Sequence, residues 1–179
     1  MLLERDKSQL LMIDIQEKLL PAISDPALIV NNGSRLLEAA RTLAVPVIVS
    51  EQYPAGLGHT VPELAKLVPA NAAHEKLEFS CFANPALHAV LSAADRQTVI
   101  FGIEAHVCVL QTALEMAAAA HDVTIVVDAI GSRVADSKDI ALRRMQDAGV
   151  RLASTEMVLF EWLRRAGTPE FKAISRLIR

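Results

Sequence analysis

Three polar residues stand at or after the ends of apolar runs that are typical of strands: Asp14, Lys76 and Cys108. A cysteine supplies a nucleophile, a carboxylate can accept its proton, and an ammonium group holds thiolate and carboxylate together. The three residues are far apart in the sequence. The carboxyl ends of parallel strands nevertheless lie at one edge of a sheet, where ligands bind. If the sheet is parallel, these residue types predict a cysteine-based catalytic group at that edge.

Cys108 is expected in the first turn of a helix. It follows an apolar run at 98–101 and then Gly102, which permits a sharp backbone turn. Small and apolar residues recur at helical spacing after that turn. The amides at a helix start lack intrahelical partners, and together with the helix dipole they stabilise a thiolate and can hold an oxyanion.

The helix dipole alone is too weak to ionise the Cys108 thiol at neutral pH. Lowering a thiol pKa from about 8.5 to about 6.5 takes roughly 2.7 kcal/mol. A helix terminus contributes about 0.3–1 kcal/mol, and about 2 kcal/mol at best. Either Lys76 supplies the remainder, or the thiol stays protonated until Asp14 accepts its proton during attack. The residue types leave both alternatives open.

The elements that must position these residues alternate along the chain. Apolar runs lie at 8–14, 46–50, 72–77, 98–101, 123–127 and 150–153. Helical patterns stand between them, and a polar loop is expected over 128–137. The apolar runs lack polar alternation, as do strands that are buried on both faces. The pattern predicts one α/β domain over residues 1–179, with a parallel sheet covered by helices on both sides.

Composition narrows the classes of partner. The chain is 52% hydrophobic and 22% charged, which is typical of a packed globular protein. Its net charge is −3, so nucleic acid is not an expected partner. No apolar run approaches the roughly 18 residues of a membrane span, and the charged residues 1–7 do not resemble a secretory signal. Two cysteines, Cys81 and Cys108, fit a reducing cytoplasmic setting, and Cys81 is expected to be inert.

Several separated motifs carry a resemblance to a known family. They are Asp14-Ile15-Gln16, Glu75-Lys76, and the stretches 50–54, 102–109 and 131–133. Their types and order resemble the isochorismatase-like cysteine hydrolases over nearly the whole chain, most closely the small isochorismatase-domain-containing proteins. The resemblance implies the isochorismatase-like hydrolase fold, a three-layer α/β/α arrangement with an open, six-stranded, mostly parallel sheet.

The resemblance also implies a set of site residues. It implies a catalytic triad of Asp14, Lys76 and Cys108. It implies a non-proline cis peptide bond between Ile103 and Glu104. The backbone N–H groups of Glu104 and Cys108 would then form an oxyanion hole.

No metal or other cofactor is expected. The resemblance extends to nicotinamidases, which bind a metal through an Asp and histidines after the second strand. In this chain the stretch 50–53 reads Ser-Glu-Gln-Tyr, and although His59 and His74 are near, no Asp-x-His pair is present. A metal site needs three or four converging ligands.

Five further residues are candidates for substrate binding. Gln16 orients Asp14, lines the pocket, or makes a structural hydrogen bond. Tyr53 and Phe79 are expected as apolar walls or as core residues, and His106 precedes the nucleophile closely. Arg133 either binds a substrate carboxylate bidentately or forms a surface salt bridge.

The resulting hypothesis is a metal-independent cysteine hydrolase that acts on a small-molecule substrate. A cysteine nucleophile favours a covalent acyl intermediate and an amide-like or carbamoyl-like C–N bond over the vinyl ether of isochorismate. The alternative is a catalytically idle or redox-sensitive binding or assembly module. The C-terminal helix, with Phe171, Ile174, Leu177 and Ile178 on one face, packs either on a neighbouring subunit or on its own domain. A homo-oligomer is expected.

Overall fold

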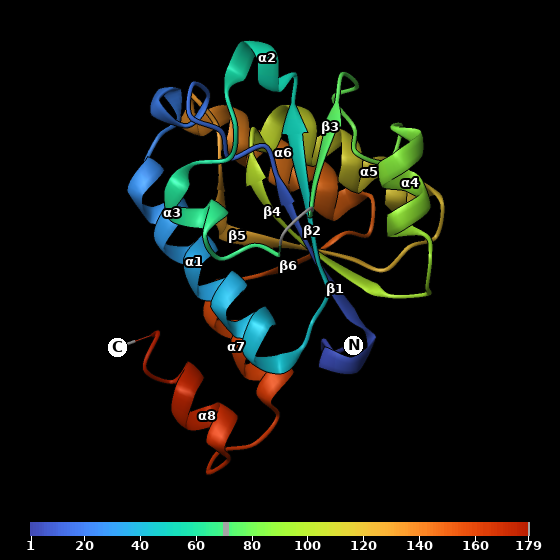
Figure 1. Cartoon of the computed structure of the whole chain (residues 1–179). Coiled ribbons are helices and arrows are strands. Elements are labelled where there is room, and N and C mark those ends of the chain that lie inside the picture. The colour runs from blue at the N-terminus through green and yellow to red at the C-terminus, as the bar shows by residue number, and fades with distance from the viewer. Residues whose placement is uncertain (70–71, 179) are drawn as a thin grey trace.

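The computed structural model describes residues 1–69 and 72–178, and within them one six-stranded sheet forms the centre of the molecule (Figure 1). The strand order is β3-β2-β1-β4-β5-β6, and each neighbouring pair is parallel. The strands are β1 (Ser8–Ile13), β2 (Val47–Gln52), β3 (Ala73–Lys76), β4 (Gln97–Ile103), β5 (Val123–Gly131) and β6 (Arg151–Ala153). The predicted open six-stranded sheet is confirmed, and it is parallel throughout where a mostly parallel sheet was expected.

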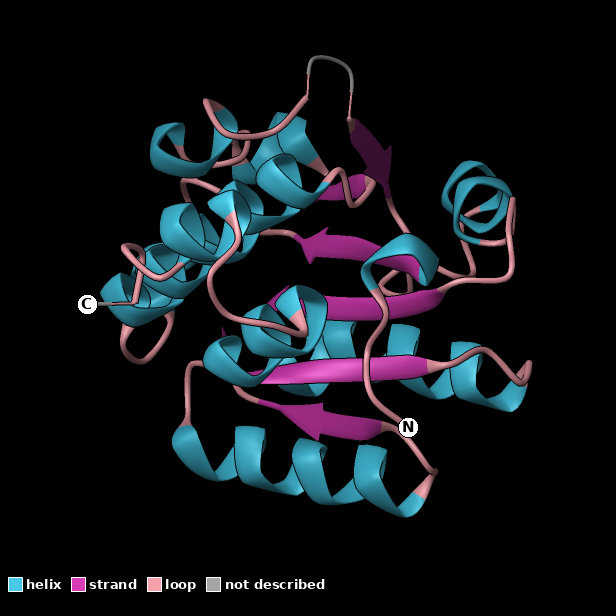
Figure 2. Ribbon diagram, turned by 90° about the horizontal axis from the view of Figure 1, so that it is seen from below, coloured by secondary structure: helices cyan, strands magenta, loops and turns pink. Residues whose placement is uncertain are grey.

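Helices cover both faces of the sheet, which gives three layers (Figure 2). The α-helices are α1 (Pro26–Leu43), α2 (Pro54–Leu57), α3 (Pro62–Ala65), α4 (Pro85–Leu91), α5 (Leu110–Ala118), α6 (Ala135–Asp147), α7 (Thr155–Leu163) and α8 (Pro169–Ile174). Short 3-10 helices occur at Arg5–Lys7 and Leu20–Ala22, and a π-helix, η3, at Ala105–Val109. One apolar core lies between the sheet and α1, α3, α7 and α8, and a second lies between the sheet and α4, α5 and α6.

The sheet is buried on both faces because successive side chains of a strand point to opposite sides. In β1, Leu10 and Met12 belong to the first core, whereas Leu11 and Ile13 belong to the second. This arrangement explains why the strand sequence is apolar throughout. The central strands β1 and β4 end at the same edge of the sheet, and that edge carries the predicted site.

Strand β5 is longer than predicted, because residues expected in a polar loop continue the strand to Gly131. Asp128 lies within the strand, where its Oδ1 accepts hydrogen bonds from the backbone N–H and the hydroxyl of Thr155 at 2.7 and 2.9 Å. A polar side chain in the strand is thus satisfied by the first turn of α7. The expected loop shrinks to 132–134, and α6 begins at Ala135.

Gly102 allows β4 to run close to β1. Its φ angle is +131°, and a Cβ atom at this position would lie 2.1 Å from the carbonyl oxygen of Ile13. A side chain would therefore separate the ends of the two central strands.

The C-terminal helix packs on its own domain. Ile174 is fully buried in the core that α1 and α7 share, and Arg35 Nε of α1 donates a hydrogen bond to the carbonyl of Leu177 at 2.7 Å. Figure 1 shows α8 beside the lower end of α7. Of the two alternatives for this helix, the structure has the intramolecular one. Among the described residues, helices long and apolar enough to span a bilayer are absent.

Candidate active site

Asp14 follows β1 directly, in the left-handed conformation with φ +53°. Its side chain is fully buried, and both carboxylate oxygens accept hydrogen bonds. The hydroxyl of Ser50 donates to Oδ1 and the ammonium group of Lys76 donates to Oδ2, each at 2.7 Å. Ser50 is brought there by the pairing of β1 with β2, in which it lies opposite Ile13. The structure thus joins two of the three predicted triad residues in a buried ion pair.

Lys76, the last residue of β3, holds its ammonium group among three oxygen atoms. Besides Asp14, the Oε1 atom of Gln52 lies 2.7 Å from Nζ and the carbonyl oxygen of Phe79 lies 3.2 Å from it. Each of the three N–H bonds of the ammonium group has an acceptor. Burial lowers the pKa of Lys76, but the groups around it, above all the charge of Asp14, together raise the pKa above its ordinary value. Lys76 is therefore a cation at neutral pH.

Cys108 lies in η3, just beyond the carboxyl end of β4. Its carbonyl accepts a hydrogen bond from the hydroxyl of Thr112 at 2.7 Å, and the residue is only 5% exposed. The predicted helix start is present, but its first turn is a π-helix and the α-helix begins at Leu110. The amides of Val107 and Val109 both donate to the carbonyl of Glu104, at 3.1 and 3.2 Å, which widens this turn. Single π-turns of this kind are frequent at functional sites.

The thiol of Cys108 is protonated at neutral pH. Burial raises its pKa most, and the negative charge of Asp14 and a hydrogen bond with the Asp14 side chain raise it further. The charge of Lys76 lowers the pKa of the thiol, but by less than the other contributions raise it. Of the two alternatives that the sequence left open, this geometry favours a neutral thiol beside a base over a resting thiolate.

The segment before the cysteine is fixed to the loop after β5. The peptide bond between Ile103 and Glu104 is cis. Glu104 Oε2 accepts hydrogen bonds from the backbone N–H and from Nε of Arg133, both at 3.1 Å. His106 Nδ1 lies 2.9 Å from the hydroxyl of Ser132. Two side chains of the segment around Cys108, those of Glu104 and His106, therefore contact consecutive residues of the neighbouring loop.

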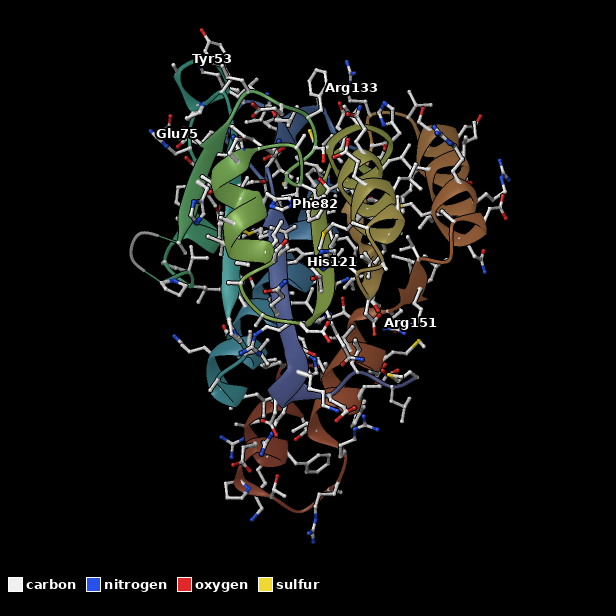
Figure 3. The ribbon with its side chains drawn as sticks, turned by 90° about the vertical axis from the view of Figure 1, so that its right-hand side faces the viewer. Tyr53, Glu75, Phe82, His121, Arg133 and Arg151 are labelled. Carbon is white, nitrogen blue, oxygen red and sulfur yellow. The ribbon has the colours of Figure 1, made fainter. Side chains whose placement is uncertain are left out.

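Three of the five candidate substrate-binding residues are exposed at the carboxyl edge of the sheet. Tyr53 and Phe79 are each 54% exposed, so they are not core residues, and the side chain of Arg133 is 60% exposed. Figure 3 shows Tyr53 and Arg133 at the same end of the molecule. His106 is partly buried. Arg133 forms a salt bridge, which is its predicted alternative role, with Glu104 in the segment before Cys108.

Gln16 has the structural role that was expected as its alternative. The side chain is buried, and its Oε1 accepts a hydrogen bond from the backbone N–H of Gln52 at 2.7 Å. Its Nε2 donates to the carbonyls of Gln52 and Gly58, at 3.0 and 2.6 Å. Each polar atom of the side chain is thus used by the backbone, as the structural alternative for Gln16 predicts.

Sequence reasoning gave no role to Ser50 and Gln52, which contact the Asp14–Lys76 pair, and did not predict that Cys81 lies near it. Ser50 and Gln52 alternate on β2, so their side chains share one face of the strand, and this spacing was a usable signal. Cys81 lies in a loop and gave no signal. It is fully buried, and burial and the charge of Asp14 raise its pKa to about 11, although Lys76 opposes them.

The histidines near β2 do not gather into a metal site. His59 Nδ1 lies 2.9 Å from Oε2 of Glu51, whose Oε1 accepts hydrogen bonds from the N–H and the hydroxyl of Thr60, both at 2.7 Å. Across residues 1–69 and 72–178, no three His, Cys, Asp or Glu side chains converge so that they would hold a metal ion.

Comparison with known proteins places this geometry in a family. The model of the isochorismatase domain matches residues 8–157. Isochorismatase domain-containing protein 2 of Danio rerio is 41% identical over 174 residues, which is 96% of this chain and 86% of that protein.

Solved structures have the same fold. The MAR1 ribonuclease of Caenorhabditis elegans superposes with a TM-score of 0.93 at 36% identity, covering 99% of this chain and 92% of that one. YcaC of Pseudomonas aeruginosa, solved with hexane-2,5-diol and covalent acrylamide, gives 0.90 at 27% identity, with 97% and 89% covered. YcaC of Escherichia coli, described as an octameric hydrolase of unknown specificity, gives 0.92 at 24% identity, with 98% and 90% covered. By sequence and by fold, the chain belongs to the isochorismatase domain family.

Proposed function

We propose that the chain is a cysteine hydrolase that cleaves an amide-like or carbamoyl-like C–N bond through an acyl-cysteine intermediate. One observation carries the proposal. The buried carboxylate of Asp14 accepts a hydrogen bond from the ammonium group of Lys76 at 2.7 Å, and its charge and a hydrogen bond with it raise the pKa of the Cys108 thiol. A buried base, a nucleophile and a fixed cation in contact are the parts that nucleophilic acyl transfer needs.

In the first step the sulfur of Cys108 attacks the substrate carbonyl while the thiol proton passes to Asp14. A C–S bond forms, and the carbonyl π electrons move to oxygen. The C–N bond then breaks as Asp14 returns the proton to the leaving nitrogen. In the second step a water molecule attacks the thioester and gives a proton to Asp14. The C–S bond breaks, and that proton returns to the sulfur.

Two features stabilise the charges that develop. Lys76 remains protonated and balances the negative charge that Asp14 and the thiolate share, because its pKa is raised. The backbone N–H groups of Glu104 and Cys108 are proposed to bind the oxyanion, since Glu104 immediately precedes η3 and Cys108 lies within it. Removal of one oxyanion donor typically lowers kcat by about 10²–10³. No step of this scheme requires a metal or another cofactor.

The substrate of this scheme is a small molecule. Cys108 is only 5% exposed, which fits a small acyl group better than a bulky one. Tyr53 and Phe79 at the edge are proposed to contact its apolar part. His106, which is within hydrogen-bond distance of Ser132, and Arg133, which bonds Glu104, are proposed to contact its polar part.

The relatives add support of two kinds. YcaC of Pseudomonas aeruginosa was solved with covalent acrylamide, an electrophile, and this supports the proposal that a nucleophile of this chain, Cys108 just beyond β4, forms a covalent bond. YcaC of Escherichia coli is octameric, and on that analogy we propose that this chain also forms a homo-oligomer. Size-exclusion chromatography with light scattering would test the oligomer.

The function is tested by screening small amides, ureido compounds and isochorismate for release of ammonia, amine or pyruvate. We expect ammonia or amine from at least one C–N substrate. Cys108→Ala should abolish this release, and Cys81→Ala, which removes the other buried thiol, should retain it. Release of pyruvate from isochorismate alone would instead support the vinyl-ether reaction. A C–N hydrolysis that Cys108→Ala leaves at the wild-type rate would refute the proposal.

A further inference from the structure

Gln52 is the acceptor of the Lys76 ammonium group that sequence patterns did not reveal. It is the last residue of β2, and its side chain is buried. Its Oε1 lies 2.7 Å from Lys76 Nζ, the same distance as Oδ2 of Asp14. Its Nε2 donates to the carbonyl of Leu77 at 2.9 Å, which fixes which end of the amide faces the ammonium group. The oxygen therefore points at the lysine because the nitrogen is already used.

The backbone of Gln52 is held in turn by Gln16. Gln16 accepts from the N–H of Gln52 and donates to its carbonyl, at 2.7 and 3.0 Å, as a neighbouring strand would. The Gln16 side chain thus pairs with the backbone of β2 at Gln52, two residues beyond Ser50, the last residue that pairs with β1. Two glutamines in series connect the segment after β1 to the lysine at the end of β3.

We propose that Gln52, clamped by Gln16, is a positioning residue that holds the Lys76 ammonium group against Asp14 and near the sulfur of Cys108. The proposal rests on the proposed function, because it assigns Lys76 its role there. Lys76 lies at the end of a strand of only four residues and has a long, flexible side chain. Three hydrogen-bond acceptors together fix the position of its ammonium group. Gln52 supplies the acceptor that comes from the adjacent strand, β2.

The choice of an amide at position 52 has a chemical reason. A carboxylate there would also accept from Lys76, but it would compete with Asp14 for the cation and add a second buried negative charge. An apolar side chain would leave one ammonium proton without an acceptor in a buried site. Only a neutral acceptor fixes the cation and leaves its charge for Asp14 and the thiol.

The test measures alkylation of Cys108 by iodoacetamide at pH 8, quantified by peptide mass spectrometry, in Gln52→Met and Gln52→Glu. Below the thiol pKa the rate follows the thiolate fraction. Gln52→Met should alkylate about 3-fold more slowly, because the cation that favours the thiolate is held less well. Gln52→Glu, which is nearly isosteric, should be about 10-fold slower, because it adds a negative charge. The matched control Gln111→Met alters an exposed glutamine one helical turn from Cys108 and should keep the wild-type rate.

The direction of the change in alkylation rate shows whether Gln52 positions Lys76 or only fills space. A Gln52 that only fills space would loosen the site when replaced, expose the sulfur and speed alkylation. Rates in both variants that equal or exceed the wild-type rate would overturn the proposal, and thermal melts would show that both variants are folded. Alkylation needs no substrate, so failure of the proposed hydrolysis would be seen in the turnover screen and not in this measurement.

Discussion

The buried ion pair between Asp14 and Lys76 makes a large prediction about stability. Both side chains have no solvent exposure, and Lys76 Nζ lies 2.7 Å from Asp14 Oδ2. Replacement of Lys76 by Met keeps most of the side-chain volume but leaves the Asp14 carboxylate buried without its cation. Loss of one partner from a buried pair typically costs about 3–5 kcal/mol. For a domain of this size that cost corresponds to a fall in Tm of about 6–20 °C.

A double-mutant cycle attributes this cost to the pair. Free energies of unfolding would be measured by urea denaturation for Lys76→Met, Asp14→Asn and the double variant. The double variant should be more stable than the sum of the single changes predicts, by about 2 kcal/mol, because neither charge is left alone. Ser50, which still donates to position 14, would keep that side chain hydrogen-bonded in all four proteins. A cost below about 1 kcal/mol for Lys76→Met, or strict additivity, would refute the reasoning.

The remaining predictions concern the thiol and the turn before it. Wild-type Cys108 should alkylate ever faster from pH 7 to pH 9 without reaching a plateau, because its pKa is raised; a plateau below pH 8 would contradict this. Asp14→Asn should speed alkylation at pH 8 by about 10-fold or more, because it removes a charge and a hydrogen bond that raise that pKa. The same variant should slow turnover of an identified substrate by about 10²–10⁴, and a slower alkylation would argue against contact between the two groups. Gly102→Ala should lower the free energy of unfolding by about 3 kcal/mol, since its Cβ would lie 2.1 Å from the carbonyl oxygen of Ile13. Gly167→Ala, with open space around it, should lower that free energy by about 1 kcal/mol, and equal losses in denaturation would contradict the packing argument.

The sequence predicted the convergence of the site because one rule governs it. Apolar runs without polar alternation indicate parallel strands, and parallel strands end at a common edge. Asp14 and Lys76 follow from this rule alone, as each stands at the end of a strand. Cys108 follows from the same rule and the glycine turn before it.

Other features depend on tertiary contacts that no local pattern encodes. The π-helical turn around Cys108 widens the backbone locally, but the apolar residues of the α-helix that follows keep their usual spacing, so the sequence pattern does not reveal the turn. Asp128 looked like the start of a loop because its partner, Thr155, belongs to a distant helix. The hydrogen bonds between Gln16 and Gln52 form because of the register of β1 against β2, and the whole sheet sets that register.

In the proposed reaction, the sulfur of Cys108 carries the acyl group of the substrate. The most direct test of this step is intact-protein and peptide mass spectrometry on enzyme quenched in acid during turnover of a substrate from the amide and ureido screen. We expect a mass increase equal to the acyl or carbamoyl group, located on Cys108, present in wild type and absent from Cys108→Ala. Turnover without an adduct on Cys108, or an adduct on Cys81 alone, would contradict it.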